Sequence, residues 1–61
     1  MREALFTVSP RPNGTLIAEC SVLNLAVSAT DRDALREEAR EALINAIGPA
    51  HVGYRLRLQK P

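Results

Sequence analysis

The segment from Thr30 to Gly48 carries the clearest hydrophobic pattern in the chain. Its apolar residues recur at helical spacing, so they share one face of an α-helix: Leu35, Ala39, Ala42, Leu43, Ala46 and Ile47. Thr30 is a typical N-cap, because its hydroxyl can accept a hydrogen bond from a free backbone N–H of the first turn. Gly48 can adopt a left-handed conformation after the last turn, and Pro49 prevents continuation. The sequence therefore predicts one helix here, whose apolar face the rest of the chain must cover.

Three segments before the helix alternate between apolar and polar residues, which is typical of β-strands. They cover residues 3–9, 15–20 and 24–29. The residues between the first two predict a hairpin loop, because proline lacks an N–H donor and Asn13-Gly14 favours a tight reversal. The residues from Ser21 to Leu23 fit either a short turn or a bulge. The strand faces that can point toward the helix are Ala4, Phe6 and Val8; Leu16, Ala18 and Cys20; and Leu23, Leu25 and Val27.

The residues that follow the helix predict a closing strand at 52–58. Val52, Tyr54, Leu56 and Leu58 share one face of this strand, while Gly53, Arg55 and Arg57 share the other. The predicted order is β-β-β-α-β in a single domain spanning residues 1–61. We therefore expect an α+β fold, a two-layer sandwich in which one helix packs on one face of a mostly antiparallel sheet.

Length and cysteine content indicate that this domain needs a partner. A 61-residue chain buries only about 60% of the surface that its unfolded form exposes, so it is marginally stable alone. Cys20 is the only cysteine, which excludes an internal disulfide, and Cys20 with His51 cannot complete a four-ligand zinc site. We expect no metal and no cofactor. The sequence therefore predicts that a homo-oligomer, a dimer or a larger assembly, or else an outside partner, supplies the missing stability.

Charge and hydropathy narrow the classes of partner and the compartment. The net charge is +1, which argues against bulk electrostatic capture of nucleic acid as the main activity. There is no run of about 20 apolar residues, so we expect no membrane span. The first residues lack the apolar core of a signal peptide, and a lone cysteine fits a reducing compartment. These features together predict a cytoplasmic protein.

Candidate catalytic and metal-ligating residues are few. A nucleophile at Cys20 would need a base within hydrogen-bonding reach, and His51 is the only histidine. The alternative is a buried, inert Cys20 and a solvated loop histidine, because free cysteine is among the most buried residue types. Glu37, Glu38 and Glu41 fit a solvated helix flank better than a metal site. We expect that the protein is not an enzyme.

The predicted partner interface lies on the sheet face opposite the helix. Leu5 and Ile17 are apolar positions there, and exposed apolar patches often mark interfaces. Gly53 lacks a side chain and allows a partner backbone to approach. Arg55 and Arg57 fit a charged strand that resists aggregation. The alternative is a patch that binds nucleic acid or an acidic partner. We favour it less because the net charge is small and no aromatic stacking platform accompanies the arginines.

A resemblance to a known family follows from three segments. The hairpin turn at Asn13-Gly14, the return strand Leu16-Ile17-Ala18-Glu19-Cys20 and the helix residues 33–43 resemble the HicB-type antitoxins, whose small domains have a partial ribonuclease H fold. The similarity covers roughly residues 3–47. The chain departs from the family at Val22-Leu23-Asn24-Leu25, where the usual turn carries glycine, and at Ala29, where glycine often precedes the helix.

The resemblance implies a protein-binding function. Domains of this family bind a small ribonuclease toxin, cover its active site and usually self-associate, and they carry no catalytic residues of their own. Family members commonly add a DNA-binding domain, for which 61 residues leave no room. The resemblance thus implies a stand-alone antitoxin-like module that acts on a ribonuclease. Two alternatives stay open, a small nucleic-acid-binding protein and an orphan structural domain.

Overall fold

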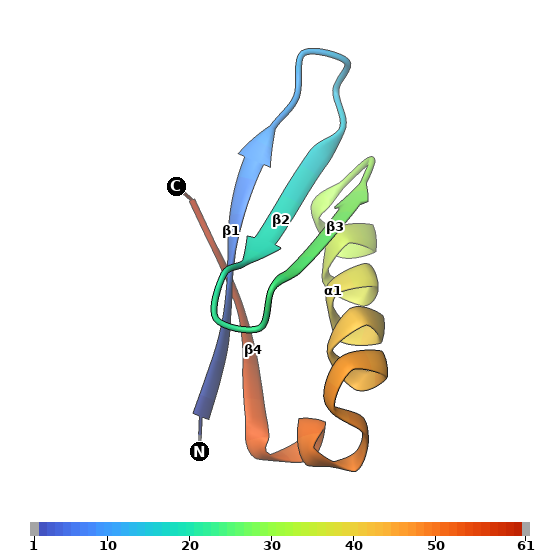
Figure 1. Ribbon diagram of the computed structural model, residues 1–61. Helices are drawn as coiled ribbons and strands as arrows, with labels where there is room; N and C mark the ends of the chain where they lie inside the picture. The colour runs from blue at the N-terminus through green and yellow to red at the C-terminus, as the bar shows by residue number, and fades with distance from the viewer. Residues whose placement is uncertain (1, 61) are drawn as a thin grey trace.

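A four-stranded β-sheet with one α-helix on one face forms the protein in the computed structural model, which describes residues 2–60 (Figure 1). The elements follow the order β1 (Arg2–Pro10), β2 (Leu16–Cys20), β3 (Leu25–Ala29), α1 (Arg32–Ile47), a 3₁₀ segment η1 (Gly48–Gly53) and β4 (Tyr54–Gln59). The structure confirms the predicted α+β sandwich with its β-β-β-α-β order. The 3₁₀ segment is an addition that the pattern of apolar residues does not indicate.

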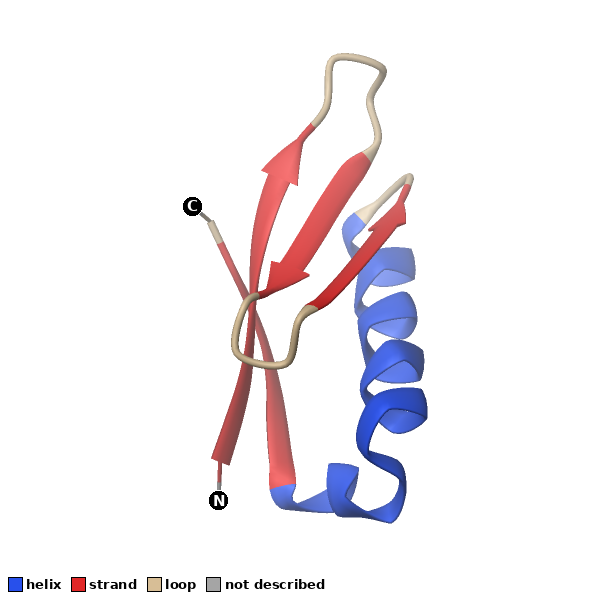
Figure 2. Ribbon diagram, in the orientation of Figure 1, coloured by secondary structure: helices blue, strands red, loops and turns tan. Residues whose placement is uncertain are grey.

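The strands lie in the order β3-β2-β1-β4. β2 pairs antiparallel with both β1 and β3, whereas β4 pairs parallel with β1. The sheet is therefore mostly antiparallel, as expected, with one parallel pair. The parallel pair requires a crossover connection. The connection is α1 with η1, which carries the chain from one edge strand to the other (Figure 2).

β1 divides its length between two neighbours. Its residues Arg2 to Thr7 pair with β4, and its residues Thr7 to Pro10 pair with β2 (Figure 1). The sheet is consequently staggered, and the molecule is elongated, with principal extents of 34 × 18 × 18 Å.

The core lies between α1 and the sheet. Phe6 and Leu35 are fully buried, and the remaining buried side chains are small or aliphatic: Ala4, Val8, Ala18, Cys20, Ala39, Leu43 and Leu58. The strand faces predicted to point toward the helix all contribute to this core or pack against it. Ala46 is an exception among the helix positions, because it is exposed near the end of α1. An aliphatic core of this kind gains its stability from area removed from water.

Asp31, and not Thr30, caps the helix. The backbone of Asp31 is extended, and its side-chain Oδ1 accepts a hydrogen bond from the Ala34 N–H at 2.8 Å. The predicted N-cap was therefore wrong by one residue. Both residue types cap well, and the carboxylate adds a negative charge at the positive end of the helix dipole. At the other end, Gly48 has φ +60°, which confirms the predicted positive φ at that glycine.

Both reversals in the sheet depend on residues that tolerate positive φ. Gly14 has φ +87°, and Asn13 Oδ1 accepts a hydrogen bond from the Thr15 N–H at 3.1 Å, so the predicted hairpin loop is confirmed. The second reversal is a turn over residues 21–24 that ends at Asn24 with φ +56°. Asparagine adopts this conformation more readily than most residues. Of the two alternatives for Ser21 to Leu23, the structure shows the turn.

The closing strand begins two residues later than predicted. Val52 and Gly53 belong to η1, and Val52 is 74% exposed, so it is not part of an inward strand face. His51 lies in the same segment, and its Nδ1 donates a hydrogen bond to the Gly48 carbonyl at 2.8 Å. That bond requires the proton on Nδ1, because a carbonyl can only accept. Pro49 is the second residue of the 3₁₀ segment, where its fixed φ suits a first helical turn.

Candidate protein-binding surface

Three of the five predicted interface residues lie together on the sheet face opposite α1. Arg55 pairs with Glu3 and Arg57 with Leu5 in the parallel register of β1 and β4. Arg57 also forms an ion pair with Glu3, with 3.6 Å between Nη1 and Oε2, and both side chains are about half exposed. Leu5 is 38% exposed. This part of the face is therefore mainly charged, with one leucine in its middle.

Ile17 and Gly53 lie elsewhere. Ile17 pairs with Ser9, which is four residues beyond Leu5 along β1. Four residues of a strand span about 13 Å, so Leu5 and Ile17 do not form one apolar patch. Gly53 ends η1 and precedes β4, so it does not open a strand interior to a partner backbone. The structure thus divides the predicted interface into separate parts.

A larger apolar surface lies on the helix side, between α1 and β4. We call it the α1–β4 groove, and it is lined by Arg40, Leu43, Ile44, His51, Val52, Tyr54 and Leu56. Ile44 is 38% exposed and Val52 is 74% exposed, while Tyr54 and Leu56 are half-buried. Apolar groups from three elements therefore meet at a surface that stays partly exposed to solvent.

The groove exists because one helix cannot cover four strands. Outer strands of such a sheet are about 14 Å apart between their axes, whereas a helix is about 10 Å wide. α1 packs mainly against β3, with fewer contacts to β2 and β4. The inward residues Tyr54 and Leu56 of β4 are consequently only half covered. Sequence reasoning missed this site, although a prediction of one helix for four strands already implies that part of the sheet is left uncovered.

Arginines from α1 extend the basic character of β4. Arg32 Nη2 donates a hydrogen bond of 3.4 Å to the Leu58 carbonyl in β4. Arg36 lines a surface pocket with Arg55 and Arg57, and Arg40 lines the α1–β4 groove. Positions 32, 36 and 40 form one stripe of the helix, because residues four apart lie one above the other. The basic group at this edge is thus larger than the two strand arginines that the sequence pattern indicates.

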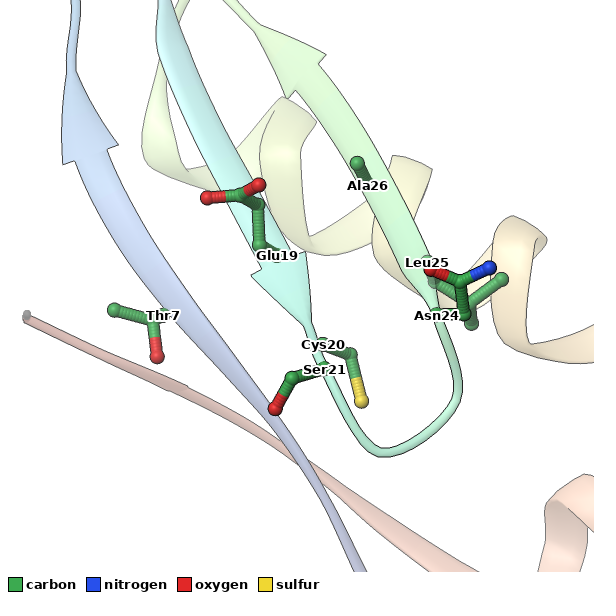
Figure 3. A pocket seen from close by; sticks show the side chains of 7 residues that line it. All are labelled: Thr7, Glu19, Cys20, Ser21, Asn24, Leu25 and Ala26. Carbon is green, nitrogen blue, oxygen red and sulfur yellow. The ribbon is translucent and has the colours of Figure 1, made fainter.

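A second surface hollow lies beside the turn between β2 and β3 (Figure 3). It is lined by Thr7, Glu19, Cys20, Ser21, Asn24, Leu25 and Ala26. Cys20 is 2% exposed, which confirms its predicted burial. Glu19 points away from the Cys20 sulfur because neighbouring strand residues face opposite sides of a sheet (Figure 3). His51 lines the α1–β4 groove and bonds its own 3₁₀ segment, so the structure does not join it to Cys20.

Two further observations concern metals and membranes. Within residues 2–60, no three His, Cys, Asp or Glu side chains gather closely enough to hold a metal ion. In the same part of the chain, the structure contains no helix with the length and apolar character that a membrane crossing requires.

Comparisons with protein-family models, curated proteins and solved structures found no match to this chain. Its surfaces and its resemblance to HicB-type antitoxins are therefore the basis for a functional proposal.

Proposed function

We propose that the protein is an interaction module that binds another protein through the α1–β4 groove. The observation that carries this proposal is the apolar surface of Ile44, Val52, Tyr54 and Leu56, which the chain leaves partly exposed. Burial of such side chains is the main favourable term in protein association. The partner contributes apolar side chains that fill the space beside α1.

The exposed area of the whole chain supports this proposal. Its accessible surface is 4315 Å², compared with about 3,900 Å² for a compact monomer of this mass. Inward-facing residues that α1 leaves partly uncovered, such as Tyr54 and Leu56, contribute to this surface. A partner that covers the groove removes part of this surface from water.

We propose further, from the resemblance to HicB-type antitoxins, that the partner is a small ribonuclease toxin and that the module neutralises it. The direct test uses the product of the neighbouring reading frame, about 60–80 residues long, as the companion expected for such a family. The purified product is assayed for RNA cleavage with and without the module. Stoichiometric loss of cleavage is the expected result, and undiminished cleavage by an active product refutes neutralisation.

Variants connect the binding to the groove. Ile44→Asp and Val52→Asp place a charge on the proposed contact surface, and we expect each to weaken binding by at least tenfold. Val22→Asp is the matched control, because Val22 is 90% exposed in the turn between β2 and β3, outside the groove. Isothermal titration measures all three. Equal loss of affinity in Val22→Asp, or none in the groove variants, excludes the α1–β4 groove as the binding site.

Self-association is the second part of the proposal. β3 is an edge strand, and its residues Leu25–Ala29 carry no charge, whereas β4 at the other edge carries Arg55 and Arg57. The arginines of β4 repel the same basic strand of a second copy, so β3 is the edge suited to pair with a second copy. Light scattering at micromolar concentration is expected to give a dimer. Ala26→Lys on β3 should produce a monomer, and a folded wild-type monomer refutes this pairing.

A further inference from the structure

β4 is an edge strand with arginines on both of its sides. Within the described residues, β1 is its only strand neighbour, so its outer edge has no strand partner. Arg55 and Arg57 project on the face opposite α1, and Arg36 and Arg40 approach from the helix side. Arg32 reaches the Leu58 carbonyl from the first turn of α1. We call this set the arginine-lined edge.

Five of the eight basic residues of the chain belong to this edge, although the net charge is only +1. The acidic residues of α1 do not share the stripe of its arginines. Positions 33, 37 and 41 form the neighbouring stripe, about 100° further around the helix, and Glu38 lies about 100° beyond that. Basic residues therefore outnumber acidic ones at this edge, although the totals for the chain are nearly balanced. A local positive field of this kind attracts an anionic partner.

The spacing of the arginines fits an extended peptide. Arg55 and Arg57 are two residues apart in a strand, a repeat of about 6.6–6.8 Å. Alternate side chains of a strand added beside β4 have the same repeat. Arg36 and Arg40 are one helical turn apart, with a rise of about 6 Å along the other side. An extended run of acidic residues can therefore place carboxylates opposite arginines on both faces of the edge.

We propose that the arginine-lined edge binds an extended, Asp- and Glu-rich segment of a protein partner by strand addition to β4. The free backbone groups of the edge supply hydrogen bonds that do not depend on the peptide's sequence, and the arginines select for acidic side chains. This inference rests on the proposed function, because it specifies the chemistry of the protein partner that the module binds. The neighbouring α1–β4 groove, which shares Leu56 with this edge, receives the apolar part of that partner.

Single-stranded nucleic acid is the competing anion, and the aromatic residues argue against it. Proteins that bind single strands without sequence preference stack bases on exposed aromatic side chains. Phe6 is fully buried, and Tyr54 is half-buried in the groove on the helix side. The arginine-lined edge therefore offers charge and free backbone groups but no stacking platform.

Glu3 provides an internal check on the site. It lines the same pocket as Arg36, Arg55 and Arg57, and its carboxylate already contacts Arg57 at 3.6 Å. An incoming carboxylate competes with Glu3 for this guanidinium. Removing the Glu3 charge should therefore strengthen the binding of an acidic peptide, which is the opposite of what damage to the fold produces.

The test measures fluorescence anisotropy of labelled octapeptides with the full chain at low and at physiological salt. The probe alternates Glu and Thr. Its comparisons alternate Lys and Thr, or carry an N-methyl group on every backbone nitrogen of the Glu–Thr sequence, and an RNA octamer is the nucleic-acid probe. We expect the Glu–Thr peptide to bind best, with at least tenfold weaker binding of the Lys and N-methylated peptides. Binding of the N-methylated peptide as tight as that of the Glu–Thr peptide overturns strand addition, because N-methylation removes the donors that pairing requires.

Variants locate the site. Exposed charge pairs contribute modestly to binding free energy, so the double variant Arg55→Gln/Arg57→Gln should lower the affinity for the Glu–Thr peptide about three- to twentyfold. Glu3→Gln should tighten it about twofold. Arg11→Gln, an exposed arginine in the loop between β1 and β2, is the control and should leave affinity unchanged. Circular dichroism confirms that each variant is folded.

The outcomes separate this inference from the proposed function. RNA binding that equals or exceeds peptide binding, or affinity lost equally in Arg11→Gln, overturns the assignment of an acidic peptide to this edge. Failure of the Glu–Thr peptide to bind, with the neighbouring gene product still inhibited, overturns the edge site alone. Peptide binding without inhibition of any ribonuclease refutes neutralisation and leaves the edge site intact.

Discussion

Replacing Leu35 with alanine should strongly lower the free energy of unfolding. Leu35 is 0% exposed and belongs to the buried cluster that α1 forms with Phe6 and the other inward side chains of the sheet. Full burial of a leucine is worth about 1.5–3 kcal/mol, and the cavity left by truncation raises the typical cost of Leu→Ala to about 2–5 kcal/mol. A 61-residue domain has a free energy of unfolding of about 3–9 kcal/mol. The substitution therefore removes between a fifth and all of it.

Urea unfolding followed by circular dichroism measures this loss. With a slope of about 1 kcal/mol per molar urea for a domain of this size, the midpoint should fall by at least about 2 M. Ile44→Ala is the matched control on the same helix. Ile44 is 38% exposed, so its truncation removes less buried apolar surface than that of Leu35. Protein concentration must be the same for all variants, since self-association raises apparent stability.

The losses of unfolding free energy in Leu35→Ala and Ile44→Ala, compared with each other, test whether α1 places Leu35 against the sheet. We expect Ile44→Ala to cost less than half as much as Leu35→Ala, because part of its side chain is already in water and alanine favours the helix. Equal costs, or a larger cost for Ile44→Ala, would show that α1 does not place Leu35 against the sheet. In that case the two-layer arrangement itself is wrong.

Three further experiments test local features. Asp31→Ala should lower the free energy of unfolding by about 0.5–2 kcal/mol in urea titrations, because it removes the hydrogen bond from the Ala34 N–H. Thr30→Ala should change this free energy by less than about 0.5 kcal/mol. A larger loss in Thr30→Ala than in Asp31→Ala refutes the assignment of Asp31 as the cap. Gly48→Ala should lower the free energy of unfolding by about 1–3 kcal/mol, because φ is +60° at Gly48. Gly53 has no positive φ, so Gly53→Ala should be tolerated. Equal thermal midpoints of the two variants contradict this expectation. Cys20 should react slowly with a thiol reagent in the folded protein and rapidly in urea, because its side chain is 2% exposed; fast labelling of the folded protein contradicts its burial.

Hydrophobic periodicity predicted the elements of the fold because burial has a direct signature in sequence. The alternation in β1 and the helical spacing of Leu35, Ala39 and Leu43 both identify residues that the structure buries. The helix boundary was harder, since Thr30 and Asp31 are adjacent residues of good capping type and only geometry selects between them. The 3₁₀ segment was missed because Val52 continues the alternation of β4 in sequence while its backbone has already left the strand.

The candidate surfaces were predicted less completely than the fold. Alternation placed Leu5, Arg55 and Arg57 on one face, but the register of β1 with β2, which separates Ile17 from Leu5, depends on how the hairpin closes. The contribution of Arg36 and Arg40 depends on which flank of α1 faces β4, and that follows from tertiary packing. Periodicity assigns residues to faces, whereas a surface made from two elements requires their relative position.

The division of β1 between two neighbours has a consequence for how the chain acquires its structure. Arg2 to Phe6 find their strand partner only in β4, so the first strand depends on the last one, across a separation of roughly 50 residues. During synthesis, β2 can pair with the end of β1, and β3 with β2, before β4 exists. The start of β1, which includes Phe6, then has no strand beside it until translation is nearly complete. Chaperones or proteases that recognise exposed apolar segments therefore meet this region first, and premature termination within β4 yields a nascent chain whose leading strand has lost its parallel neighbour.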